Sequence, residues 1–169
     1  MELQEAILKR RSIRKFKDTE VSKEDIKKLL ELAMAAPSAL NKQPWEFIVI
    51  TNKEILEKIR STVRFMKHNA PVAVIVCGNK DRFISAPVKN FYMEDCSAAI
   101  ENFMLGATDL GLGTCWCGIA PNPIATKQIK SIVKFDKKLV PFGLIYLGYG
   151  DEIKEPRTQF DESKVHYVE

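Results

Sequence analysis

Residues 90–110 read "NFYMEDCSAAIENFMLGATDL", and this stretch predicts the longest helix of the chain. Its apolar residues recur at helical spacing and form a wide stripe, namely Cys96, Ala99, Ile100, Phe103, Met104, Ala107 and Leu110, which Tyr92, Ala98 and Leu105 extend further round. A helix with so little polar surface is buried, either at the centre of a domain or against another subunit. Gly111 and Gly113 follow it and predict where it ends.

Shorter elements surround this helix, in a mixed order of helical and strand patterns. Further helices are expected at residues 2–10, from Ser22 to about 36, from Asn52 to 60, and after Asn122-Pro123. Strands are expected at residues 45–51, 71–78 and 114–118, and in a segment that ends near 148. No repeat or linker interrupts the chain. We therefore predict one α+β domain over residues 1–150 and a polar C-terminal extension, 151–169, that packs on a partner chain.

Composition gives the broad class of protein. The chain has 169 residues, of which 46% are hydrophobic and 28% charged, as in globular proteins generally. Its start, "MELQEAILKR", carries acids where a signal peptide has positive charge, and no apolar run approaches the roughly 20 residues that span a membrane. We expect a cytoplasmic protein with no membrane partner.

The net charge of +4 is concentrated in "KRRSIRKFK", residues 9–17. Without the six basic residues of this segment, 20 basic and 22 acidic residues remain, a net charge of −2. Proteins that bind a nucleic-acid duplex spread their phosphate contacts over a face. The pattern therefore favours a local anion site, or an ordinary surface cluster at a helix end, over a nucleic-acid partner.

Within this segment, Ile13 and Phe16 alternate with the charges, so some basic side chains must point into a cleft. Arg10, Ser12 and Arg14 can then present two guanidinium groups and a hydroxyl at one point. The planar fork of arginine suits bidentate binding of phosphate.

Two loops also carry polar or glycine-rich patterns. The segment "AAPSALNKQPW", 35–45, holds amide and hydroxyl groups between two prolines, which fits either a preformed site or a rigid turn facing water. The glycines of "GLGTCWCGIAPN", 111–122, allow a backbone to approach a flat ligand closely. Neither the G-x-G-x-x-G fingerprint of dinucleotide sites nor a P-loop is present.

The four cysteines do not predict a metal site. Cys115 and Cys117 form a C-x-C pair, which does not match common zinc or thioredoxin spacings, and the two histidines, His68 and His166, lie in other segments. Cys77 and Cys96 lie in apolar stretches and are expected in the core.

Together these motifs resemble the nitroreductase-like flavoproteins, small FMN-dependent oxidoreductases. The resemblance is carried in order by "ILKRRSIRKF", "APSALNKQPWEFIVI", "MEDCSAAIENFMLGATDLGLGTCW", "PFGLIYLGYG" and "KEPR", over nearly the whole chain. It implies a mainly antiparallel sheet flanked by helices, in an intertwined homodimer with two FMN molecules at the interface.

The resemblance also implies which residues bind FMN. Arg10 and Arg157 would clamp its phosphate, Ser12 and Arg14 would lie beside the flavin, and Arg11 would add to the phosphate site or face solvent. A cation at Arg14 favours the reduced flavin electrostatically. The partner subunit would contribute Pro37, Ser38, Ala39, Asn41 and Gln43. The backbone of Trp116, Cys117 and Gly118 would pass the ring.

The activity implied is ping-pong transfer of hydride from NAD(P)H, through FMN, to a nitroaromatic, quinone or similar acceptor, with no catalytic side chain. Only residues 79–89 separate the second strand from the long helix. Larger members have lid helices there, so the resemblance is to a lid-poor member. The alternatives are a flavin dehydrogenase of another specificity, a flavin-fragmenting enzyme, or an FMN carrier or sensor without turnover.

Overall fold

The computed structural model describes residues 1–85 and 89–169. This part of the chain contains four strands and five α-helices, which confirms the predicted α+β class. In chain order the elements are α1 (Leu3–Lys9), α2 (Lys23–Met34), β1 (Trp45–Ile50), α3 (Lys53–Thr62), β2 (Val72–Asn79), α4 (Tyr92–Asp109), β3 (Gly113–Gly118), α5 (Pro123–Ile132) and β4 (Leu139–Gly148).

The four strands form one sheet in the order β1-β2-β4-β3. Every neighbouring pair is antiparallel, as expected. All eight residues of β2 are buried, which explains its continuous apolar sequence. β3 pairs with β4 on one side and is an edge strand of the sheet.

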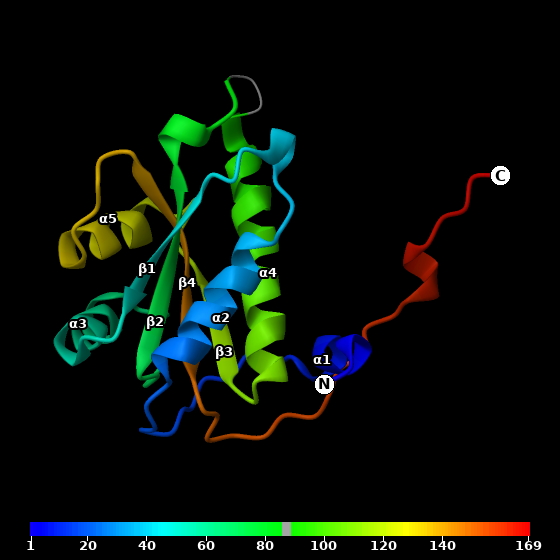
Figure 1. The fold of residues 1–169 in the computed structure, drawn as a ribbon, viewed down its shortest axis with the longest axis horizontal. Coiled ribbons are helices and arrows are strands. Elements are labelled where there is room, and N and C mark those ends of the chain that lie inside the picture. The colour runs from blue at the N-terminus through cyan, green and yellow to red at the C-terminus, as the bar shows by residue number, and fades with distance from the viewer. Residues whose placement is uncertain (86–88) are drawn as a thin grey trace.

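Helices cover both faces of this sheet (Figure 1). The α2 and α4 helices lie on one face, where Leu29 and Phe103 share a core with Ile145. On the other face, α3 and α5 pack on Tyr146 through a separate core that also contains both cysteines of β3. Successive residues of a strand point to opposite faces, so Ile145 and Tyr146 serve different cores.

The α4 helix is the long apolar helix that the sequence predicts, and it is buried against α2 and the sheet. Gly106 permits the close packing on α2, because a Cβ there would lie 2.5 Å from Cδ1 of Leu32. Gly111, with φ of +72°, turns the chain after the helix. Gly113 was expected to end the helix as well, but it opens β3 instead.

Side-chain caps explain where the shorter helices begin. Ser22 accepts a hydrogen bond from the backbone N–H of Asp25, and Asn52 and Asn122 cap α3 and α5 in the same way. These caps satisfy backbone donors that the first turn of a helix leaves without partners. The three predicted starts are therefore confirmed.

Both end segments of the chain lie outside the sheet and its covering helices, with α1 beside α4 and the C-terminus well away from the N-terminus (Figure 1). α1 buries only Ala6, while Leu3, Ile7 and Leu8 are exposed. The extension beyond Gly150 passes α1 and then runs away from the body, with Phe160 and Tyr167 more than 80% exposed.

Candidate functional site

The basic segment is fixed along the free edge of β3. The Ile13 N–H donates to the Thr114 carbonyl at 2.8 Å, and Ser12 forms a parallel bridge with the same residue. Phe16 is buried and pairs with Gly150. The apolar residues between the charges therefore anchor this segment, as its alternation predicts.

The start of the C-terminal extension lies alongside the basic segment. The Lys17 N–H donates to the Tyr149 carbonyl, and the Asp151 N–H donates to the Lys15 carbonyl, both at 2.9 Å. Further along, the Arg157 N–H donates to the carbonyl of Leu8 at 3.2 Å. These contacts bring the "KEPR" motif back to the end of α1.

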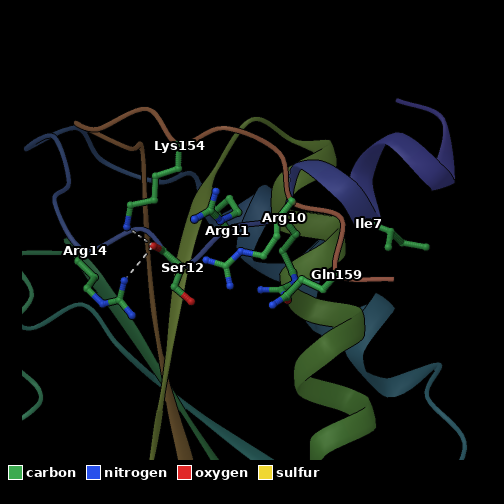
Figure 2. A pocket seen from close by; sticks show the side chains of 8 residues that line it. Ile7, Arg10, Arg11, Ser12, Arg14, Lys154 and Gln159 are labelled. Carbon is green, nitrogen blue, oxygen red and sulfur yellow. Dashed lines mark hydrogen bonds between the residues drawn. The ribbon is translucent and has the colours of Figure 1, made fainter. Parts of the chain in front are cut away.

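A cavity of about 300 Å³ opens between these two segments (Figure 2). It is lined by Ile7, Arg10, Arg11, Ser12, Arg14, Lys154, Arg157 and Gln159. Five of these side chains are cationic and none is a carboxylate. Like charges repel at this spacing, so the arrangement favours a bound anion that carries more than one negative charge.

Hydrogen bonds and an ion pair hold the cations that line the cavity. Lys154 Nζ donates to the Ser12 carbonyl at 2.6 Å and Arg14 donates to the same oxygen at 3.4 Å, as the dashed lines of Figure 2 show. Arg11 donates to the carbonyl of Glu155. The Nε of Arg10 lies 3.0 Å from a carboxylate oxygen of Glu101 on α4.

Glu152 holds the extended segment that carries Arg14. Its carboxylate accepts the Arg14 N–H at 2.5 Å and lies 3.1 Å from Lys154 Nζ. The backbone hydrogen bond from Arg14, with the hydrogen bond and charge of Lys154, lowers the pKa of Glu152 below its usual value. These contacts therefore favour the ionised form of the carboxylate.

The other basic residues of the segment do not line this cavity. Lys9 pairs with Glu5 one turn away on α1, at 2.5 Å, and Lys15 and Lys17 are exposed. The six charges of "KRRSIRKFK" thus divide into three that line the cavity and three on the surface.

The loop at residues 37–43 is fixed by hydrogen bonds of its own. Ser38 Oγ accepts the Gln43 N–H at 2.9 Å, and the Gln43 amide donates to Asn41 Oδ1 at 3.1 Å. The Ala39 N–H donates at 2.8 Å to the buried carboxylate of Asp95, in the first turn of α4. Pro37, Asn41 and Gln43 are exposed, whereas Ser38 and Ala39 are half-buried.

One chain does not bring this loop to the cation-lined cavity. The loop lies at the start of α4, whereas Ser12 pairs with Thr114, which follows the end of that helix (Figure 1). The 18 residues of α4 extend about 27 Å. Arg10 reaches back only to Glu101, near the middle of the helix.

Residues 116–118 continue the free edge of β3 beyond Ser12. Thr114 directs its carbonyl outward to Ile13, and backbone groups alternate along a strand, so those of Trp116 and Gly118 also point to this edge. Gly118 is exposed and a Cβ there would meet nothing within 4 Å. The side chains of Trp116 and Cys117 pack into opposite cores, so only the backbone is available to a ligand at this edge.

Lys154 and Gln159 line the cavity but were not among the predicted site residues. Lys154 belongs to the "KEPR" motif, from which only Arg157 was selected. Gln159 lies in the polar extension, which has no periodic pattern.

Comparison with known proteins assigns the family. The family model described as "Nitroreductase family" matches residues 7–64 and 63–149. A protein of Methanothermobacter thermautotrophicus, provisionally named NADH dehydrogenase/NAD(P)H nitroreductase, is 40% identical over 168 residues, 98% of this chain and 86% of its own. The chain belongs to the nitroreductase family.

Solved structures of nitroreductase-family proteins agree with this assignment. An FMN-dependent nitroreductase of Clostridium difficile is 35% identical, with a TM-score of 0.83 over 97% of this chain and 98% of its own. A provisionally named nitroreductase of Desulfovibrio desulfuricans, solved in complex with FMN, is 26% identical, with a TM-score of 0.81 over 98% and 96% of the two chains.

Two further predictions for this nitroreductase-family chain concern the membrane and a lid over the site. Among the residues that the structure describes, no helix has both the length and the apolar character needed to cross a membrane. The prediction of a lid-poor member rests on residues 79–89, of which 86–88 lie outside the described residues.

Proposed function

We propose that this protein is an FMN-dependent NAD(P)H oxidoreductase that acts as a homodimer. The observation that carries the proposal is the cavity with five cations and no carboxylate in its lining. A phosphate monoester is a dianion at neutral pH, and paired guanidinium groups are its best partners in proteins. In this proposal Arg10, Arg11, Arg157 and Lys154 hold the phosphate.

The free edge of β3 supports FMN rather than a simple phosphate. The edge leads away from Ser12 and exposes backbone donors and acceptors at Trp116 and Gly118. A flavin ring carries carbonyl and ring-nitrogen groups that such a backbone can pair with. The backbone of Cys117 would lie beside the flavin ring, and Arg14 would supply positive charge near the ring.

The loop at residues 37–43 supports a site shared between two chains. Its polar groups are preorganised by internal hydrogen bonds, yet it does not line the cavity of its own chain. We assign Pro37, Ser38, Ala39, Asn41 and Gln43 to the FMN of the partner subunit. The exposed apolar residues of α1 and of the extension then supply the dimer interface.

The chemistry that FMN supplies is hydride transfer, taken from NAD(P)H and passed to a nitroaromatic, quinone or similar acceptor in a ping-pong reaction. The side chains described above bind and orient the cofactor and set the charge around it. Relatives named as NAD(P)H nitroreductases and as an FMN reductase support this activity. A cytoplasmic location remains part of the proposal.

The test is to measure bound flavin and its reduction. We expect purified protein to release FMN at about one per chain, and the yellow colour to bleach with NADH or NADPH under anaerobic conditions and return with a nitroaromatic. Protein that cannot take up FMN would refute the proposal. Protein that binds FMN but is not bleached by either nucleotide would be a carrier or sensor instead.

A further inference from the structure

The fold brings one histidine to the C-x-C pair of β3. The side chains of Cys115 and Cys117 point to the same face of the sheet, because they are two residues apart on one strand. His68 comes from the segment between α3 and β2, which passes over that face. The two Sγ atoms and a ring nitrogen of His68 all lie within 4.8 Å of one another.

This arrangement is held by contacts that involve no ligand. The Tyr146 hydroxyl donates to the Met66 carbonyl at 2.8 Å, and the Cys117 sulfur lies 4.0 Å from the carbonyl oxygen of Phe65. The His68 ring packs edge-on against the Tyr146 ring, with 5.3 Å between their centres. Residues 65–68 are thereby fixed over the two thiols, and the three donor groups meet before any ion binds.

We propose that His68, Cys115 and Cys117 form a binding site for a thiophilic d10 metal ion, Zn²⁺ or Cu⁺. Two thiolates and one imidazole are soft or borderline ligands of the kind that these ions prefer. Tetrahedral Zn²⁺ holds such donor atoms roughly 3.6–3.8 Å apart, so the site needs to contract by only about 1 Å. His68 is half-exposed and both cysteines are buried. Three protein ligands leave the fourth position of a tetrahedral ion to water or another ligand.

A disulfide between the same cysteines fits this strand less well. Residues two apart in an extended strand have Cα atoms about 6.6 Å apart, near the upper limit for a disulfide. A metal ion bridges sulfur atoms over a longer distance. The extended geometry of β3 therefore favours metal binding over oxidation.

The test uses the full-length protein with its cysteines reduced and with oxidised FMN bound, after treatment with a chelator. Co²⁺ serves as the spectroscopic probe, because its ligand-field bands lie in the red, where oxidised flavin does not absorb. Zn²⁺ and Cu⁺ affinities are measured separately by competition with chromogenic chelators. We expect one ion per chain and weaker binding at lower pH, since protons compete with the metal ion for thiolate and imidazole ligands.

Variants then locate the ion. Cys115→Ser and Cys117→Ser should each abolish binding, and His68→Gln should weaken it more than about tenfold, since even loss of an outer partner of a metal ligand costs 10- to 100-fold. Cys96→Ala and His166→Gln are matched controls that should bind normally. Tight binding of either Zn²⁺ or Cu⁺ with this pattern supports the site. Failure of both ions to bind, or binding that persists in the Cys115, Cys117 and His68 variants, would overturn it. FMN content, measured on the same samples, is a separate readout.

Discussion

The cation-lined cavity and the loop at residues 37–43 are two polar regions of the same molecule, and they differ in how far one chain completes them. The cavity gathers cations from residues 10–14 and 154–157, all of one chain. The loop is equally well ordered by hydrogen bonds, but Pro37, Asn41 and Gln43 face outward. The difference fits the proposal that an anion can bind one chain, whereas the whole FMN molecule needs two.

Arg10→Ala, a change within the cavity, should have the largest effect on FMN affinity. Loss of a charged hydrogen-bond partner costs about 1.5–3 kcal/mol, so FMN affinity should fall roughly 10- to 100-fold. Isothermal titration of cofactor-free protein with FMN measures this change. Lys17→Ala removes a charge from the same segment outside the cavity and should bind FMN as the wild type does. If the Arg10 variant and the wild type bound FMN with equal affinity, the phosphate would not bind in this cavity.

Changes to the extension should act on the dimer rather than on the cavity. Phe160 and Tyr167 are more than 80% exposed in one chain, and large aromatic side chains are the common anchors of interfaces. Phe160→Ala with Tyr167→Ala should raise the dimer dissociation constant by about tenfold or more, as measured by analytical ultracentrifugation over a dilution series. Lys164→Ala, in the same extension, is the control. A dimer of unchanged strength would place the interface elsewhere.

Asp95→Ala should loosen the loop without touching the cavity. The Ala39 N–H would lose its buried acceptor, at a cost of about 1–3 kcal/mol, which corresponds to a fall in Tm of roughly 2–12 °C. FMN affinity should also drop several-fold, because the loop would no longer be preorganised. The neighbouring exposed acid offers a control, Glu94→Ala. If FMN affinity stayed constant while Tm fell, the loop would not contact the cofactor.

Glu152→Gln should have the smallest effect, and one that depends on pH. The folded state lowers the pKa of Glu152 from its ordinary value of 4.5, so the carboxylate stabilises the protein fully at pH values above 4.5. This contribution is lost as the pH falls through the lowered pKa. The difference in Tm between wild type and variant should therefore be greatest near neutral pH and shrink below about 4.5. Glu24→Gln controls for loss of a carboxylate. A difference that grows in acid would contradict the assignment.

The sequence predicts local structure well because the relevant interactions are local. Apolar spacing is enough to predict α4, and single side chains at Ser22, Asn52 and Asn122 determine helix starts. The cations of residues 10–14 could be selected because they lie together in the chain and alternate with Ile13 and Phe16. The long-range order of the strands has no comparable local signal.

Contacts between distant segments account for what the sequence did not predict. Lys154 reaches the cavity because the extension pairs with residues 8–17, and a polar segment without periodicity does not indicate where it will pack. His68 meets Cys115 and Cys117 only after β3 and the segment following α3 have been placed on one face of the sheet. The separation of these residues along the chain was the reason to expect no metal site.

The most direct test of the shared cofactor site is FMN binding by a heterodimer. One chain would carry Arg10→Ala and Arg157→Ala, and the other Ala39→Trp, which blocks the loop; different affinity tags allow the mixed dimer to be purified. Neither homodimer should retain FMN. The account predicts about one FMN per heterodimer, because the intact cavity of one chain faces the intact loop of the other. A heterodimer without FMN would show that each site is built within a single chain and would contradict the account.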